Sequence, residues 1–171
     1  MAPPLTSRDI ERLRGSKRVF TGKRLKLFSE VFPWLLVPVL IYDVVALFSD
    51  RVAPDGSPGI RSALDAAALQ VPMLSDVTMW VSWGELFVVF AVIFLAIEVI
   101  KATSTASTTI INHVLSMGLF VICLMQFLMF ASFATGTFFI LTCLVLLDAL
   151  AGMVVTIISA RRDFGVEGIG A

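Results

Sequence analysis

Two ionisable side chains stand in a long apolar stretch of the chain and are the first candidates for chemistry. Residues 102–160 contain His113 and Asp148 as their only ionisable side chains apart from two cysteines. An ionised group at the centre of a bilayer costs at least about 2.5–3.5 kcal/mol, so acids there are candidates for function. Asp148 lies too far from either end of its apolar segment to reach water. Two interpretations are open: an interhelical hydrogen-bond donor kept neutral by burial, or a group that handles protons or ions.

Two further acids, Asp43 and Glu85, are expected at similar depths near the outer ends of their apolar segments. Two facing carboxylates can share a proton or hold a cation. In the alternative interpretation, each side chain points into a hydrated outer vestibule or reaches the headgroups beside Trp80 and Trp83. The sequence leaves both interpretations open.

A second polar group is expected at the opposite, inner membrane surface. Glu98 and Lys101 are three residues apart on one helical face and can pair directly. A histidine beside a carboxylate titrates near neutral pH, which is the chemistry of a proton sensor or shuttle; the alternative is an interfacial histidine that caps helix ends. This inner polar cluster consists of Glu98, Lys101, Asn112 and His113, and antiparallel counting adds Thr156 and Ser159.

Asp148 also begins a row of small residues along one helical face. Gly152, Thr156 and Ala160 follow it at intervals of four residues, a pattern that lets helices approach closely in membranes. The row predicts a packing face on the last helix. The predicted partners of Asp148 on the preceding helix are Gln126 and Cys123.

Composition identifies the elements that must position these groups. Hydrophobic residues make up 58% of the chain, charged residues 15%, and the mean hydropathy is +0.94, which excludes a soluble domain, a disordered chain and a disulfide scaffold. A bilayer core about 30 Å thick takes about 20 helical residues. The sequence predicts an all-α integral membrane four-helix bundle of two antiparallel hairpins. Its spans are residues 31–49, 79–100, 109–131 and 136–159, within one transmembrane domain over residues 30–160.

Two local features shape these spans. Pro38 has no N–H to pair with the Trp34 carbonyl, which predicts a kink in the first span. The apolar stretch 108–160 is far too long for a single crossing, so it must fold back. The cluster of small residues over 131–137 predicts a tight turn near Gly136.

The basic residues predict that both termini are cytoplasmic, N-in and C-in. Eight of the thirteen Lys and Arg residues lie in residues 1–29, one in the 101–108 loop and two in the tail 161–171, against two on the outer side. The positive-inside rule places such an excess on the cytoplasmic face. Residues 1–29 are an arm expected to contact anionic lipid or to carry only orientation charge. Outside, the apolar spacing over 60–72 predicts a short amphipathic surface helix.

Several activities are excluded because their signatures are missing. One histidine cannot supply bis-histidine haem ligation, and there is no His-Glu-x-x-His zinc motif. The chain also lacks a glycine-rich phosphate loop and a Gly-x-Ser-x-Gly nucleophile elbow. We predict no cofactor and no metal site, and no nucleic-acid partner because orientation accounts for the basic patch.

Four short runs of the chain carry a resemblance to known proteins. They are Ile97–Thr103, Ile111–Met117, Leu147–Gly152 and Ser159–Asp163. These runs resemble a group of small four-helix inner-membrane proteins from proteobacteria, to which no activity is assigned. The resemblance covers about residues 80–165, implies a bacterial inner-membrane location and the same number of spans, and transfers no catalytic residue.

These observations predict a multi-pass inner-membrane protein with a non-catalytic accessory or structural role that packs through its last span. The alternative is a small oligomeric proton- or cation-coupled transporter or channel that uses the intramembrane acids and His113. An enzyme acting on lipid would need a polar site at one interface, for which the inner polar cluster is the candidate. The expected partners are the bilayer, further copies of the chain or other membrane proteins.

Overall fold

The computed structural model describes residues 31–49, 52–102 and 108–166. The predicted basic arm over 1–29 and the end of the tail, residues 167–171, lie outside these ranges. The described chain is mostly helical. Three of its helices are long and apolar enough to cross a membrane, with the candidate spans Trp83–Lys101, Ile111–Met129 and Gly136–Val154.

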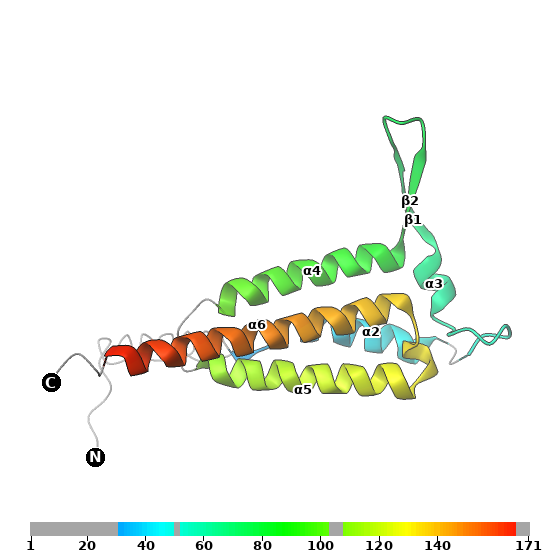
Figure 1. The fold of residues 1–171 in the computed structure, drawn as a ribbon. Helices are drawn as coiled ribbons and strands as arrows, with labels where there is room; N and C mark the ends of the chain where they lie inside the picture. The colour runs from blue at the N-terminus through cyan, green and yellow to red at the C-terminus, as the bar shows by residue number, and fades with distance from the viewer. Residues whose placement is uncertain (1–30, 50–51, 103–107, 167–171) are drawn as a thin grey trace, which may run out of the picture.

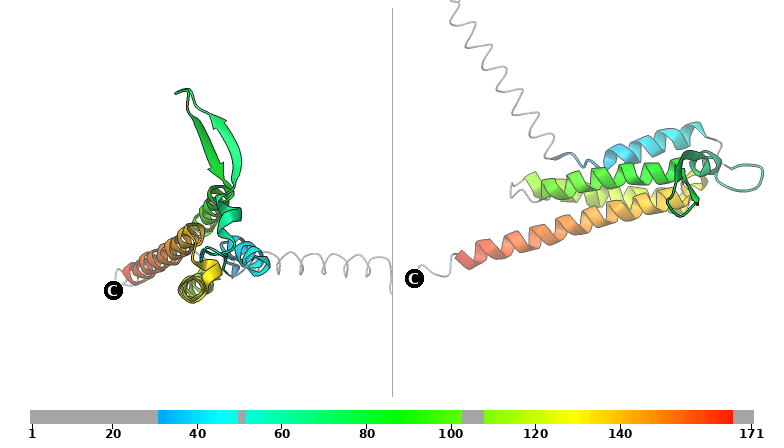
Figure 2. Two further views of the ribbon diagram at one scale, coloured as in Figure 1. Left: turned by 90° about the vertical axis from the view of Figure 1, so that its right-hand side faces the viewer. Right: turned by 90° about the horizontal axis from the view of Figure 1, so that it is seen from above.

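The three long helices run side by side. They are α4, Trp83–Ala102, α5, Thr108–Met129, and α6, Gly136–Val166. Figure 1 shows α6 between α4 and α5, and α6 packs against both. In place of the first span, predicted over 31–49, the structure has the shorter apolar helix α2, Leu36–Phe48, which is not among the three helices long enough to cross a membrane. Seen along the helix axes in Figure 2, α2 lies across from α6, with α4 and α5 on either side.

Pro38 does not kink a helix, because it lies in the first turn of α2. The Leu36 N–H donates to the Pro33 carbonyl at 2.9 Å, and the Val37 N–H donates to the Trp34 carbonyl at 3.1 Å. The Trp34 carbonyl therefore has a partner. Proline fits the first helical turn because its missing N–H would have no intrahelical acceptor there. The predicted kink is wrong, and the proline instead lies where the helix begins.

α5 and α6 are antiparallel and joined by a short connection (Figure 1). α5 ends at Met129, the 3-10 helix η1 covers Ala131–Phe133, and α6 begins at Gly136. The small-residue cluster therefore contains the predicted turn, but the turn is centred near Ser132 rather than at Gly136. α6 continues to Val166, so the predicted tail from residue 161 starts as helix.

A β-hairpin replaces most of the predicted surface helix. After the short helix α3, Arg61–Asp65, the chain forms β1, Ala67–Pro72, and β2, Thr78–Ser82, which pair antiparallel. The helix predicted over 60–72 is therefore wrong beyond Asp65, the second span starts at Trp83 instead of residue 79, and the fold is not all-α. The physical reason is strand pairing: the ladder between β1 and β2 satisfies their backbone groups, and the β2 residues favour strands.

Large apolar side chains cover the outward faces of the long helices. Only 17% of the α4 candidate span is buried inside the described structure. Soluble monomers rarely expose continuous apolar surface of this extent. The three candidate spans therefore match a membrane protein, as the composition predicts.

An aromatic cluster joins α2 to the other helices at the end that carries the α5–α6 turn. The ring centroid of buried Tyr42 lies 4.8 Å from that of Phe138, 5.8 Å from Phe133 and 6.0 Å from Phe87. The Tyr42 and Thr135 hydroxyl oxygens are 2.6 Å apart, so the polar end of this tyrosine is satisfied. One core therefore connects α2, α4, η1 and α6 at this end.

Gly84 lets the first turn of α4 approach the first turn of α6. A Cβ atom at Gly84 would lie 2.6 Å from Thr137 Oγ1 and 3.3 Å from the Leu64 carbonyl oxygen. A side chain at this position therefore needs its neighbours to move. By contrast, a Cβ atom on Gly118 of α5 would meet nothing within 4 Å.

We expect Gly84→Ala to lower the free energy of unfolding by about 1–3 kcal/mol, because the added methyl overpacks the contact with Thr137. Adding Thr137→Ala should restore most of the loss. Gly118→Ala is the matched control and should leave stability unchanged or slightly higher, since alanine favours helix. Thermal unfolding in detergent, followed by circular dichroism, measures all four proteins. Equal stability of Gly84→Ala and Gly118→Ala would contradict the close contact.

Candidate functional site

The inner polar cluster is built around an ion pair in the last turn of α4. Lys101 Nζ lies 2.8 Å from Glu98 Oε1, with the two residues three apart on the helix. The Glu98 side chain is 0% exposed, and that of Lys101 is 17% exposed. The pairing predicted from the spacing is therefore confirmed. Pairing is what allows two opposite charges to remain inside an apolar helix assembly.

Asn112, in the first turns of α5, completes the pair from the neighbouring helix. Its Nδ2 donates to Glu98 Oε1 at 2.5 Å, and its Oδ1 accepts from Lys101 Nζ at 3.0 Å. The amide thus contacts both members of the ion pair with the donor and acceptor that each requires. Asn112 is buried, as its place in the predicted cluster requires.

The segment before α2 supplies two backbone partners that the sequence did not indicate directly. Lys101 Nζ donates to the Phe32 carbonyl at 2.6 Å, and the Trp34 N–H donates to Glu98 Oε2 at 2.8 Å. Pro33 is the available signal, because a proline keeps the preceding residue out of the helical conformation. Backbone groups outside a helix must find other partners when they are buried. The Phe32 carbonyl and the Trp34 N–H find their hydrogen-bond partners in the ion pair.

His113 lies beside α6 rather than in the ion-pair network. Its side chain is mostly buried, and a Cβ atom on Gly152 would lie 1.9 Å from His113 Nδ1. The ring therefore occupies the space that glycine leaves on α6. Within the described residues, neither ring nitrogen makes a hydrogen bond. The side chains of Thr156, Ser159 and Ala160 lie outside the described part, so their predicted places in the cluster and the row are untested.

Asp148 faces α5 at Ser116, not at Gln126 and Cys123 as predicted. Its side chain is 2% exposed, and the Ser116 hydroxyl interacts electrostatically with its carboxyl. The reason is the position of the turn: Asp148 and Ser116 are equally distant in sequence from Ser132, at the centre of η1. Placing the turn at Gly136 moved the predicted partner two helical turns too far along α5.

Asp148, Ser116 and His113 form what we call the α5–α6 polar group. In the described part of the chain, Asp148 Oδ2, Ser116 Oγ and both His113 ring nitrogens are buried and make no hydrogen bond of good geometry. Ser116 lies three residues after His113 on α5, and Gly152 lies four after Asp148 on α6, so each pair shares one helical face. This group differs from the ion pair because these atoms find no hydrogen-bond partner among the described residues.

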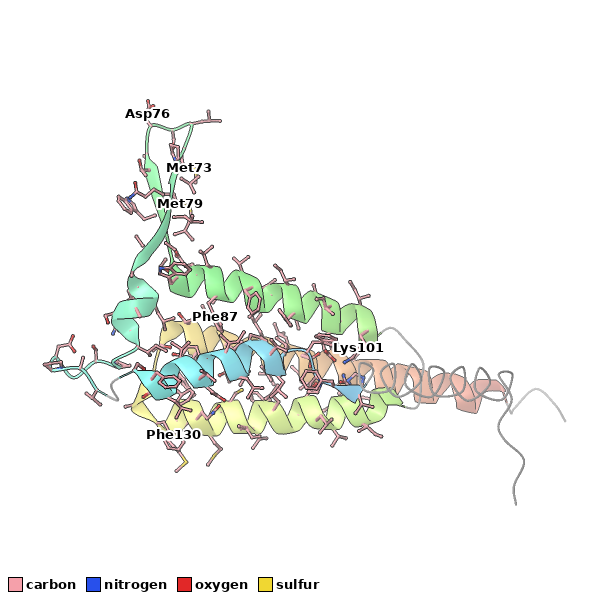
Figure 3. The ribbon with its side chains drawn as sticks, turned by 180° about the vertical axis from the view of Figure 1, so that it is seen from behind. Met73, Asp76, Met79, Phe87, Lys101 and Phe130 are labelled. Atoms are coloured by element: carbon pink, nitrogen blue, oxygen red, sulfur yellow. The ribbon has the colours of Figure 1, made fainter. Side chains whose placement is uncertain are left out.

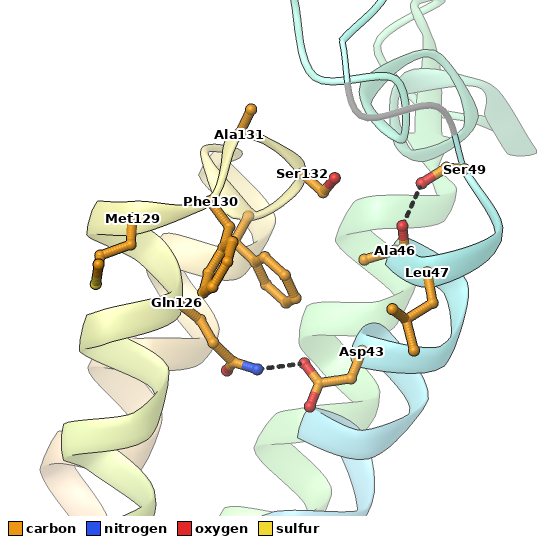
Figure 4. A pocket seen from close by; sticks show the side chains of 10 residues that line it. Asp43, Ala46, Leu47, Ser49, Gln126, Met129, Phe130, Ala131 and Ser132 are labelled. Carbon is orange, nitrogen blue, oxygen red and sulfur yellow. Dashed lines mark hydrogen bonds between the residues drawn. The ribbon is translucent and has the colours of Figure 1, made fainter.

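Asp43 lies at the other end of the helices and pairs with Gln126. Gln126 Nε2 donates to Asp43 Oδ1 at 3.1 Å, across a cavity of about 660 Å³ between α2 and the end of α5 (Figure 4). The wall also includes the α5–α6 turn. Its lining residues are Asp43, Ala46, Leu47, Ser49, Gln126, Met129, Phe130, Ala131, Ser132 and Phe133.

Glu85 does not join Asp43 in an acid pair. Its Oε2 accepts from the Ser82 backbone N–H at 2.8 Å, and its own N–H donates to Ser82 Oγ at 3.2 Å. This reciprocal arrangement is a capping box at the start of α4. Glu85 is exposed at the helix end, so of the two interpretations left open by the sequence, the one with a shared proton or cation between Asp43 and Glu85 is wrong. The Ser-x-x-Glu spacing over residues 82–85 was the signal for capping in the sequence.

We expect Lys101→Met to destabilise the protein by about 3–5 kcal/mol, because it leaves the buried Glu98 carboxylate without its counter-charge. Glu98→Gln combined with Lys101→Met removes both charges and should recover most of that loss. Thermal unfolding of the single and double variants in mild detergent measures the difference. An ion pair without a structural role would give a single variant as stable as the double one.

The described residues thus hold three polar groups between helices: the ion pair with Asn112, the α5–α6 polar group, and the Asp43–Gln126 pair. None of these residues belongs to a set of three or more His, Cys, Asp or Glu side chains placed to hold a metal ion in the described part of the chain. No protein-family model matches the chain, and neither a curated protein nor a solved structure is significantly similar to it.

Proposed function

We propose that the chain is a multi-pass membrane protein with a non-catalytic accessory or structural role. In this proposal α4, α5 and α6 cross the bilayer, and α2 with the residues before it makes the fourth crossing of a four-helix bundle. The length and apolar surface of the three long helices support this arrangement. The side-by-side packing of α2 with them supports the fourth crossing (Figure 2).

The proposal includes an orientation and a location. Eleven of the thirteen basic residues fall on one side of such a bundle, which supports cytoplasmic N and C termini. The resemblance to small proteobacterial proteins supports the bacterial inner membrane. The basic arm, residues 1–29, then lies at a surface rich in anionic lipid.

One observation carries the structural role: the charges of Glu98 and Lys101 are satisfied inside the chain. The two side chains bind each other, Asn112 of α5 and the backbone of the segment before α2. A lysine and a glutamate held by so many partners are poorly suited to take up and release an ion. They are well suited to fix the relative positions of three chain segments.

A transporter or channel of protons or cations is the second candidate, and the α5–α6 polar group favours it. Asp148, Ser116 and His113 are buried at the interface of two candidate spans, and each retains a donor or acceptor that no described residue satisfies. Such groups in membrane helices often belong to proton relays. The cavity beside Asp43 is lined by none of these three residues, so a continuous path through one copy has no support from it.

A proton-flux assay separates the two candidates. We expect wild-type protein in liposomes loaded with a pH-sensitive dye to pass no more protons than empty liposomes, and Asp148→Asn to behave identically. Asp43→Asn is the matched control, because it neutralises a different intramembrane acid. A wild-type flux that Asp148→Asn abolishes and Asp43→Asn preserves would overturn the structural proposal in favour of transport.

An accessory component must also assemble with something. We expect the protein, extracted from the membrane in polymer-bounded native discs, to run as an oligomer or with a second membrane protein, because a structural role requires contact with another chain. Native mass spectrometry of the discs measures this. A strictly monomeric protein without companions would contradict the accessory role.

A further inference from the structure

The hairpin of β1 and β2 extends away from the helices. It leaves the amino-terminal end of α4 and projects to one side of α4, α5 and α6 rather than continuing along them (Figures 1 and 2). Almost all of its residues are exposed in the structure. The turn between the strands includes Asp76, whose φ of 58° is left-handed, a conformation that aspartate tolerates better than most residues.

The strand register divides the hairpin into two unlike faces. Leu69 pairs with Val81 and Val71 with Met79, so these four apolar side chains share one face. The opposite face carries the pairs of Gln70 with Trp80 and of Pro72 with Thr78, and it is more polar. The hairpin is therefore amphipathic, and its apolar residues recur every second position, as strands require. The sequence had suggested the spacing of an amphipathic helix.

The apolar face points toward the side on which the helices lie. Figure 3 shows Met73 and Met79 on the side of the hairpin toward which α4 extends. Val71 and Met79 are 40% and 45% exposed, so nothing in the described chain covers this face fully. Apolar side chains of α4, such as Val92 and Ile93, are also exposed.

Water is a poor environment for such a hairpin. A two-stranded hairpin is marginally stable alone, and exposed apolar strands tend to pair with other chains. Among residues 66–82, Asp76 is the only charged side chain, so charge does not protect the strands. The apolar face therefore needs a cover.

The orientation of the hairpin indicates that lipid buries its apolar face. If α4 spans the membrane, a hairpin that projects sideways from its amino-terminal end lies along the bilayer surface, at the level of the interface (Figure 1). Its apolar face then meets the acyl chains beside α4. Trp80 and Trp83 lie at the same level, which is where tryptophan is enriched in membrane proteins. Its more polar face is turned toward the headgroups and water.

We propose that the β1–β2 hairpin lies in the membrane interface, with Leu69, Val71, Met79 and Val81 inserted into the lipid leaflet at the amino-terminal end of α4. This inference rests on the proposal that α4 spans the bilayer. Insertion does not need anionic lipid, since the hairpin has no basic residue. Its depth is that of an interfacial amphipathic segment, about 5–10 Å into the headgroup and acyl boundary.

Tryptophan depth measurements test the proposal on the full-length chain. The background protein carries Trp34→Phe, Trp80→Phe and Trp83→Phe, and one tryptophan is then introduced at a time. Met79→Trp and Val71→Trp report the apolar face, and Thr78→Trp and Gln70→Trp report the opposite face. Each protein is reconstituted in vesicles of phosphatidylcholine brominated at defined acyl positions, with iodide as the aqueous quencher.

We expect brominated lipid to quench Met79→Trp and Val71→Trp with a depth of about 5–10 Å, and iodide to quench Thr78→Trp and Gln70→Trp instead. Equal iodide quenching of both faces would overturn the proposal. Apolar-face probes that both quenchers miss, and that lipid reaches only after dilution of the protein in the vesicles, would show a second copy as the cover and also overturn it. Two positions on each face keep the test valid if one variant does not fold.

Val92→Trp on α4 separates this proposal from the one it rests on. Deep quenching of Val92→Trp by brominated lipid, together with iodide quenching of the apolar hairpin face, would overturn only the interfacial hairpin. Iodide quenching of Val92→Trp would overturn the membrane-spanning α4, and the hairpin proposal would fall with it.

Discussion

The burial of the Glu98–Lys101 pair constrains the other elements at its end of the helices. A lone carboxylate or ammonium among apolar helices is very costly, so each needs its counter-charge and further hydrogen bonds. Asn112 supplies both a donor and an acceptor from α5, and the backbone at Phe32 and Trp34 supplies one of each. The positions of α5 and of the segment before α2 relative to α4 follow from these bonds. Helices that depended on apolar contacts alone could slide past one another at lower cost.

The opposite end of the helices is organised by shape and aromatic packing. Tyr42 packs on rings from α4, η1 and α6, and Gly84 lets α4 approach Thr137 and Leu64 closely. The capping box of Ser82 and Glu85 starts α4 where β2 ends, so one serine closes the hairpin and begins the helix. The hairpin is held at this end by covalent continuity with α4 and by its own strand pairing.

Between these ends, α5 and α6 bring together polar groups that do not satisfy one another. The Gly152 backbone leaves room for His113, and Ser116 lies opposite Asp148. Because Asp148 and Gly152 face α5, that part of the small-residue row packs within the chain and is not a surface for a partner. The contrast with the satisfied ion pair is the physical basis for the two candidate functions, since fixed charges favour a structural role and unused donors and acceptors favour proton handling.

The sequence by itself determined what depends on local spacing. Apolar length predicts the three long helices, the i,i+3 interval predicts the Glu98–Lys101 pair, and the small residues predict the α5–α6 turn. Only the tertiary structure decided what depends on register between distant segments. A shift of the turn centre from Gly136 to Ser132 gave Asp148 a different neighbour, and capping by Ser82 separated Glu85 from Asp43. Strand pairing likewise overrode the helical spacing over 60–72, because a ladder to a second segment satisfies backbone groups that periodicity in one segment cannot reveal.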